Sequence, residues 1–127
     1  MPPCGFQFTP ARNAENVDDS DGGFTVIQVR GEADAYTAPR IRSDLSSALG
    51  TSAPLVVDLS QATFIDSTVV GILLEGLAEY EKRERALVLL LPDESAPEVH
   101  RLFELTGLTS LLPVVRSWDE AASRIAS

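Results

Sequence analysis

The chain is predicted to fold as one α/β domain, in which a mixed, mainly parallel sheet of about four or five strands is backed by about four helices. Short apolar segments rich in β-branched residues alternate along it with longer segments of helical periodicity. Strands that are joined through helices form parallel pairs. The 127 residues, 44% hydrophobic and 23% charged, suffice for one hydrophobic core but not for two.

Apolar, β-branched stretches predict the strands. They are expected at residues 4–9, 24–30, 55–59, 86–91 and 114–115. The segment 55–59 is apolar on both faces, which predicts a central strand covered on both sides. The acidic, glycine-tipped segment 13–23 is expected to be a mobile loop or part of a disordered tail, and residues 1–4 a flexible N-terminus.

The helices are predicted from periodicity and from their end signals. They are expected at residues 38–49, 67–83, 96–106 and 118–126. Thr37 and Ser117 are suitable N-cap residues, and Pro39 fits a first helical turn. Gly50 and Gly107 are suitable ends of the first and third helices. The element order is therefore β-β-α-β-α-β-α-β-α.

Charge and composition exclude several classes of function. The formal net charge of -9 argues against nucleic acid and anionic membranes as partners. No apolar run approaches the roughly 18 residues of a membrane span, and no secretory signal is present, so a cytoplasmic location without membrane insertion is expected. Cys4 and His100 are the only residues of their kinds, which excludes an internal disulfide and a multi-histidine metal site. No cofactor is expected.

Asp66 and Ser67 stand where a buried strand gives way, through a loop, to a long apolar helix. One interpretation is structural, since either residue can cap the helix by accepting a first-turn N–H. The other is a phosphorylation switch, because phosphoserine adds about 1.5 to 2 negative charges and a helix N-terminus tolerates an anion. Thr68 is the alternative acceptor. Both interpretations remain open on local sequence.

The helix after Ser67 is apolar over more than one narrow stripe. Two explanations fit this excess of apolar residues. In one, Val69, Ile72 and Gly76 lie on an exposed surface that binds a partner. In the other, neighbouring helices cover them.

Three motifs in order resemble the STAS family, named for sulphate transporters and anti-sigma factor antagonists. They are Gly-Glu-Ala-Asp-Ala-Tyr-Thr-Ala-Pro at 31–39, Asp-Leu-Ser at 58–60 with Phe-Ile-Asp-Ser at 64–67, and Phe-Glu-Leu-Thr-Gly-Leu at 103–108. The resemblance covers about residues 6–125 and implies one STAS-like domain over residues 5–127, with a mixed sheet backed by helices on one face. The length resembles that of the bacterial anti-sigma factor antagonists.

The resemblance implies a function. In the family, an antagonist binds an anti-sigma factor that is also a serine kinase and so releases a sigma factor. The kinase phosphorylates a serine that follows an aspartate, matching Ser67 and Asp66, and a phosphatase restores binding. An acidic docking residue matches Asp34. The partner-binding residues expected on this basis are Asp34, Asp66, Thr68, Val69 and Ile72. Val69 stands where the family commonly has a glycine, and its branched side chain is expected to alter kinase docking.

Two other classes of function compete with the switch. A serine hydrolase needs a base and a nucleophile elbow, but His100 is expected at the surface and no Gly-x-Ser-x-Gly motif exists, so no enzyme is expected. The alternative is a non-switching STAS subunit that scaffolds a stress-signalling or lipid-transport assembly. Its partner binding would be indifferent to Ser67. Self-association is left open.

Overall fold

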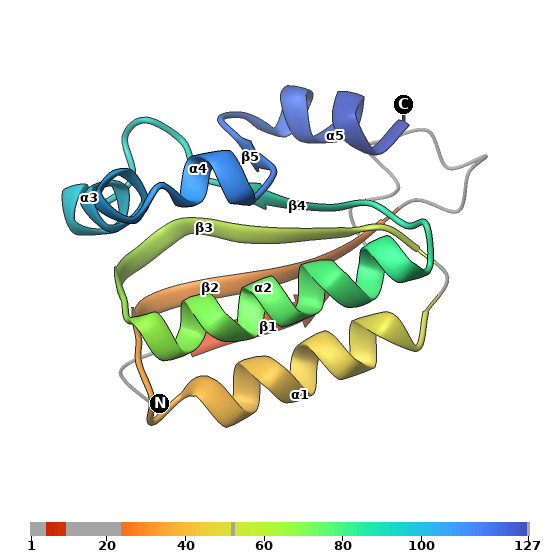
Figure 1. Ribbon diagram of the computed structural model, residues 1–127, viewed down its shortest axis with the longest axis horizontal. Coiled ribbons are helices and arrows are strands. Elements are labelled where there is room, and N and C mark those ends of the chain that lie inside the picture. Colours follow the sequence, from red (N-terminus) through yellow and green to blue (C-terminus); the bar gives the residue numbers. More distant parts are fainter. Residues whose placement is uncertain (1–4, 10–23, 52, 127) are drawn as a thin grey trace.

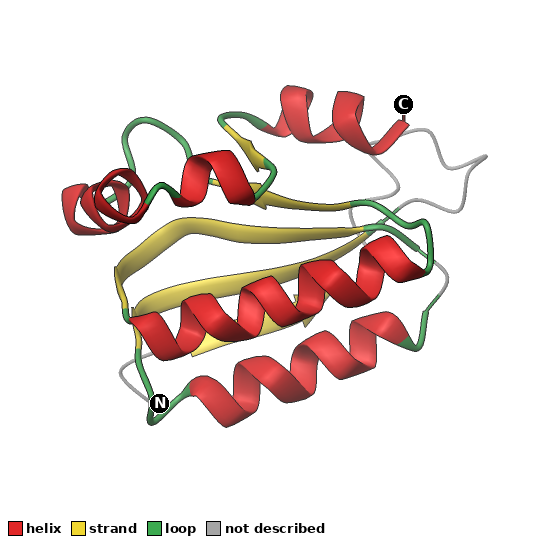
Figure 2. Cartoon of the chain, in the orientation of Figure 1, coloured by secondary structure: helices red, strands yellow, loops and turns green. Residues whose placement is uncertain are grey.

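The computed structural model describes residues 5–9, 24–51 and 53–126, which form a five-stranded sheet flanked by helices (Figures 1 and 2). The strands are β1 (Gly5–Thr9), β2 (Thr25–Ala33), β3 (Leu55–Ile65), β4 (Leu87–Leu90) and β5 (Val114–Val115). The helices are α1 (Ala38–Leu49), α2 (Ser67–Lys82), α3 (Pro97–Thr106), α4 (Leu108–Leu111) and α5 (Trp118–Ala126). The α/β class is confirmed, and the four-residue α4 is an addition to it. The flexible terminus expected at 1–4 and the mobile loop expected at 13–23 lie outside the described residues.

The strands follow one another across the sheet in chain order. β1 pairs with β2 antiparallel, and all later pairs are parallel, which confirms the mixed, mainly parallel sheet. Because each new parallel strand is added on the same side of the last, right-handed crossovers carry their helices to one face. α1, α2 and α3 accordingly contribute to one hydrophobic cluster. α5 follows the last strand and is not held to that face by a crossover.

The alternation of side chains along the strands divides the core into two layers. Val57 and Leu89 face the cluster under α1, α2 and α3, whereas Val56 and Val88 face a second cluster. Ala121 of α5 belongs to that second cluster. The helices therefore cover both faces of the sheet, and the expectation of helices on one face alone is wrong. The two-sided burial predicted for residues 55–59 is confirmed.

β2 and β3 continue well beyond the strand ends expected at residues 30 and 59. Arg30 and Ala33 of β2 pair with Gln61 and Ile65 of β3, across two register shifts. Gly31 lies at the second shift with a φ of 70°, a backbone conformation that glycine adopts without strain. The polar residues of 60–64 resemble a loop because one side of this extension is exposed. The longer strands bring the start of α1 beside the start of α2 (Figure 1).

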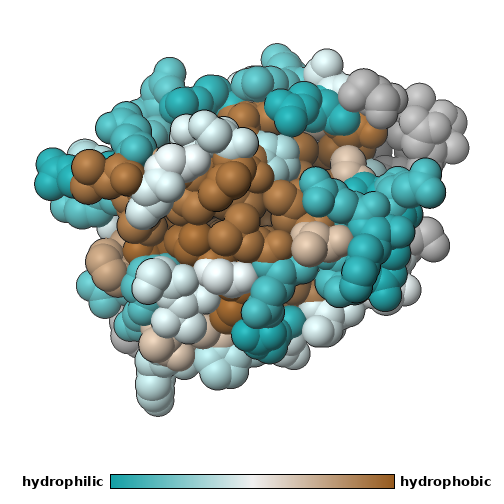
Figure 3. All heavy atoms as spheres, in the orientation of Figure 1, coloured by the Kyte–Doolittle hydropathy of each residue, from teal (hydrophilic) through white to brown (hydrophobic). Residues whose placement is uncertain are grey.

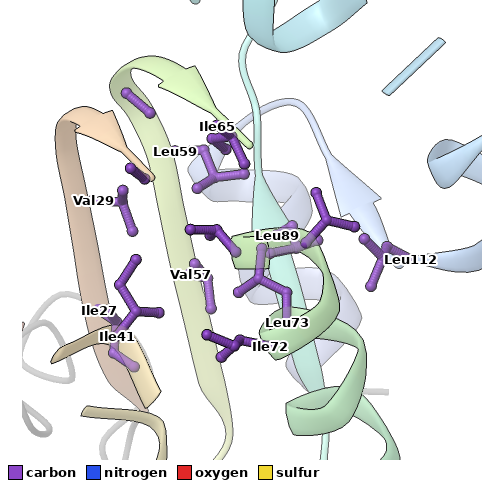
Figure 4. Packing of buried hydrophobic residues seen from close by; sticks show 14 of the residues in the cluster. Ile27, Val29, Ile41, Val57, Leu59, Ile65, Ile72, Leu73, Leu89 and Leu112 are labelled. Carbon is purple, nitrogen blue, oxygen red and sulfur yellow. The ribbon is translucent and has the colours of Figure 1, made fainter. Parts of the chain in front are cut away.

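Val69, Ile72 and Gly76 are buried, so of the two explanations the exposed partner surface is wrong and coverage by other elements is confirmed. They lie on the side of α2 that faces the sheet and α1. Figure 4 shows Ile72 and Leu73 packed among side chains of β2, β3 and β4. The partly exposed apolar residues of α2 are Leu74 and Leu77 instead. Figure 3 shows apolar surface in the region between α2 and the segment formed by α3 and α4.

Candidate functional site

Asp66, and not Ser67, caps α2. Its backbone is extended (φ -100°, ψ 175°), and its Oδ1 accepts a hydrogen bond from Val69 N at 3.1 Å. Ser67 is the first residue of the helix, and its side chain is exposed. No hydrogen bond to Ser67 Oγ is found within the described part of the chain. The capping function and the candidate phosphorylation site are therefore carried by two different residues.

The second oxygen of Asp66 joins α2 to the loop that follows β2. Asp66 Oδ2 accepts a hydrogen bond from Ala35 N at 2.9 Å, and Asp66 N donates to Ala33 O at 3.0 Å. Ala33 itself pairs with Ile65 at the end of the sheet. One carboxylate thus fixes the entry of α2 against residues that are about thirty positions earlier in the chain.

The loop from Asp34 to Thr37 is held by its own hydrogen bonds. Asp34 Oδ1 accepts from Tyr36 N at 3.0 Å and from Thr37 N at 3.2 Å. Thr37 Oγ1 accepts from Asp34 N at 3.0 Å and donates to Asp34 O at 3.1 Å. Thr37 does occupy the N-cap position of α1, but its side chain caps no helical N–H, contrary to expectation, because this loop engages it.

Some of the predicted site residues meet at this end of the sheet and others do not. Ser67 and Thr68 are exposed side by side, and Asp34 and Asp66 are half-buried next to them. Val69 is only 1% exposed. Its branched side chain points into the core. A valine in place of the family's glycine therefore adds no side chain to the outer surface around Ser67. Ile72 is buried further along the helix.

A phosphate on Ser67 would meet hydrogen-bond donors without disturbing the cap. Val69 N is taken by the Asp66 side chain and Val70 N by Asp66 O. The N–H groups of Ser67 and Thr68 have no acceptor within the described part of the chain. A phosphate can accept from such N–H groups, and the helix dipole favours an anion there. The fold is therefore compatible with phosphorylation at this position.

Sequence inspection missed Tyr36 as a residue of this site. Its side chain is 90% exposed, and its neighbour Ala35 is hydrogen-bonded to Asp66. An aromatic residue in a short polar loop between a strand and a helix was the available signal. Its position beside Ser67 depends on the pairing of β2 with β3, which spacing along the chain does not show.

The far end of α2 is anchored by Arg85, whose guanidinium donates hydrogen bonds to Leu49 O and Thr51 O after α1. The same group lies 5.2 Å from the centre of the Tyr80 ring. Burial raises the pKa of Tyr80 to about 12, against the smaller opposing effects of Arg85 and Arg83. The Tyr80 hydroxyl is buried without a hydrogen-bond partner among the residues that the structure describes.

His100 is the only histidine that an enzyme or a metal site of this chain could use. His100 is half-buried rather than on the surface, and its Nε2 donates to Pro92 O at 2.9 Å, at the start of α3. Among the described residues, no three His, Cys, Asp or Glu side chains are placed to hold a metal ion. No described helix combines the length and the apolarity needed to cross a membrane.

Comparison with known proteins gives one consistent family. The STAS domain profile matches residues 16–121. The anti-sigma-B factor antagonist of Listeria monocytogenes is 32% identical over 100 residues, which cover 77% of this chain and 84% of that protein.

Solved structures agree with this match in both sequence and fold. An anti-sigma factor antagonist from Mycobacterium paratuberculosis is 29% identical, with a TM-score of 0.71 over 97% of this chain and 96% of the other. The anti-sigma factor antagonist SpoIIAA in its unphosphorylated form is 25% identical, with a TM-score of 0.72 over 96% of each chain. The fold and these three proteins therefore point to the same family.

Proposed function

We propose that this chain, which belongs to the STAS domain family, is an anti-sigma factor antagonist that phosphorylation at Ser67 switches off. In this proposal it binds an anti-sigma factor that is also a serine kinase, and a sigma factor is released. The observation that carries the proposal is the exposed Ser67 at the first position of α2, with the capping function left to Asp66. The relatives in Listeria and Mycobacterium, both anti-sigma factor antagonists, support the antagonist role.

The modification is a phosphoryl transfer from ATP. Ser67 Oγ forms a bond to the γ-phosphorus while the bond from that phosphorus to the ADP oxygen breaks, and the hydroxyl proton goes to a base of the kinase. The exposure of Ser67 allows a kinase to reach Oγ. The structure of the similar SpoIIAA is described as its unphosphorylated form, which implies that SpoIIAA also has a phosphorylated form. This supports phosphorylation of the present chain. Thr68, also exposed, is the alternative acceptor.

Phosphorylation ends binding through charge and desolvation. A phosphate adds about 1.5 to 2 negative charges beside the carboxylates of Asp34 and Asp66. The chain already has a formal net charge of -9. A partner surface that covers Ser67 must also strip water from the dianion. A loss of about 3 kcal/mol weakens binding about a hundredfold, which suffices for a switch.

The proposed docking surface consists of the groups that gather at the start of α2. Asp66 and Thr68 flank Ser67 in the chain, and Asp34 lies in the loop that Asp66 binds through Ala35 N. The side chains of Val69 and Ile72 are buried and are available to no partner of the folded protein. A phosphatase that removes the phosphate completes the cycle. The proposal places the protein in the cytoplasm, where sigma factors act, and gives Ser67 no catalytic role.

The rival function is a scaffolding STAS subunit, and partner capture separates the two. Tagged Ser67→Ala and Ser67→Asp proteins are used as parallel baits in extracts of the source cells, with Thr68→Ala as a matched control. The switch predicts that the alanine bait and the Thr68→Ala control hold an anti-sigma factor and that the aspartate bait loses it. If all baits hold the same scaffold or transporter subunits, the switch is refuted. Incubation of the purified pair with ATP then identifies the phosphorylated residue by peptide mass.

A further inference from the structure

Tyr36 is the most exposed large hydrophobic side chain in the described part of the chain, at 90%. It lies in the loop between β2 and α1. The preceding residue, Ala35, donates its N–H to the carboxylate of Asp66, and Asp66 is followed directly by Ser67. One hydrogen bond between their chain neighbours therefore links Tyr36 to the proposed phosphorylation site, and the side chains of both Tyr36 and Ser67 are exposed. Nothing in the described fold buries the tyrosine ring, so packing within the molecule does not explain it.

The backbone that carries Tyr36 is fixed on both sides. Tyr36 N and Thr37 N both donate to Asp34 Oδ1, at 3.0 and 3.2 Å. Ala35 N donates to Asp66 at 2.9 Å. An exposed aromatic ring on a fixed loop loses little conformational entropy when it is bound. Tyrosine is also among the residues that most often dominate the energy of a protein interface.

We propose that Tyr36 is the anchor of the docking surface, and that its ring enters an apolar pocket of the anti-sigma factor. This inference rests on the proposed function and adds to it the single residue that contributes most to the affinity. The anti-sigma factor would then have an apolar pocket that takes the Tyr36 ring, and beside this pocket a flat surface that covers Ser67.

The anchor explains why phosphorylation of Ser67 ends binding. With the ring seated in a pocket, the partner covers the surface beside it and removes water from Ser67. A neutral hydroxyl is buried there at small cost, but a phosphate dianion is not. The position of the tyrosine thus makes binding sensitive to the charge at Ser67.

Charge favours a different protein over a second copy of this chain as the occupant. Glu32, Asp34 and Asp66 supply carboxylates around the tyrosine loop, and Glu32 pairs with Phe64 at the same end of the sheet. In a two-fold contact the same patch faces itself, so these carboxylates would face their own copies. The formal net charge of -9 adds to that repulsion. The continuity of the loop with Ser67 points to the anti-sigma factor.

The test measures the affinity of purified variants for the purified anti-sigma factor that the Ser67→Ala bait captures, by titration calorimetry. Tyr36→Ala is expected to weaken binding about 30-fold or more, whereas Tyr36→Phe, which keeps the ring, stays within about threefold of the wild type. Leu111→Ala on α4 removes another exposed apolar side chain (62%) and is the matched control, expected within about twofold. The thermal midpoint of Tyr36→Ala should equal that of the wild type, because the ring is 90% exposed and has no partner among the described residues.

Four results would overturn the anchor. Tyr36→Ala binding within about threefold of the wild type, while Ser67→Asp abolishes binding, would refute the anchor and leave the switch intact. A Tyr36→Phe variant as weak as Tyr36→Ala would show that the hydroxyl, and not the ring, is bound. A dimer that Tyr36→Ala converts to monomer in sedimentation would make a second copy the occupant. If the Ser67→Ala bait holds no anti-sigma factor, the proposed function and the anchor fail together.

Discussion

Replacement of Gly71 by alanine is expected to stabilise the protein, whereas the same replacement at Gly76 is not. Both glycines lie inside α2, so both lower its intrinsic helical stability. A Cβ atom at Gly71 would have nothing within 4 Å, whereas one at Gly76 would lie 3.3 Å from both Cδ atoms of Leu45 on α1. The two positions therefore separate helical propensity from packing between helices.

The magnitudes follow from these surroundings. Alanine is more favourable than glycine in a helix interior by about 0.8 to 1 kcal/mol, so Gly71→Ala should raise the free energy of unfolding by about that amount. At Gly76 the same gain is opposed by overpacking against Leu45, which is buried in the core and costs about 1 to 3 kcal/mol to displace. Gly76→Ala is therefore expected to be neutral or destabilising by up to about 2 kcal/mol.

Denaturation by urea, followed by the fluorescence of the single tryptophan, measures both effects. Trp118 stacks on Phe24 at 6.3 Å between ring centres and so reports loss of the folded contact. The slope of the free energy against urea should be the same for both variants, so that a shift in midpoint reports stability. Equal stabilisation by both substitutions would refute the packing argument, and a destabilised Gly71→Ala would refute the assignment of an open surface at that position.

Three further outcomes test the site and its support. Asp66→Ala should lower the free energy of unfolding by about 1 to 2 kcal/mol, because the helix cap is lost. Ser67→Ala should change it by less than about 0.5 kcal/mol in the same urea denaturation experiment. If Ser67→Ala were the more destabilised variant, the serine would be the cap. Arg85→Lys should lower the free energy of unfolding by about 1 to 3 kcal/mol. A single ammonium cannot reproduce both hydrogen bonds that the guanidinium donates to the carbonyls after α1. An unchanged urea midpoint would contradict this. Tyr80→Phe should be more stable by about 1 kcal/mol at neutral pH, since it removes a buried hydroxyl that has no hydrogen-bond partner in the described part of the chain. The pKa of Tyr80 in the folded protein, about 12, lies above its ordinary value of 10.0. The contribution of neutral Tyr80 to stability is therefore fully present below pH 10.0 and is lost as the pH rises through about 12. Denaturation curves of Tyr80→Phe across this range should lack that loss, and an identical loss would contradict the assignment to Tyr80.

The sequence predicted the α/β class and the order of its main elements because those signals are local. Alternation of apolar residues, Ser117 as the cap of α5 and Gly107 at the end of α3 each act within a few residues of the chain. The structure confirms them: Ser117 Oγ accepts from Glu120 N at 3.0 Å, and Gly107 adopts a φ of 70°. The position of Asp66 and Ser67 at the start of a helix was predictable for the same reason.

The ends of the strands and the burial of single side chains were harder to predict from the sequence. The extension of β3 from residue 60 to 65 depends on pairing with β2, and its exposed polar residues resemble a loop. Which face of α2 is covered depends on where α1 lies, so the burial of Val69 and Ile72 could not be decided from helical periodicity alone. Both errors concern contacts made with other parts of the chain.

By itself the sequence determined the fold class, the candidate serine and the acidic residues near it, since motif and helix start are properties of short segments. Only the tertiary structure decided that Asp66 holds the cap, that Ser67 is left exposed, and that Tyr36 lies beside it. The hydrogen bond between Asp66 and Ala35 joins residues that are 31 positions apart in the chain, so no pattern within a short segment of sequence can predict it. The parallel pairing of β2 with β3 brings the two segments together, because parallel strands end at the same edge of a sheet.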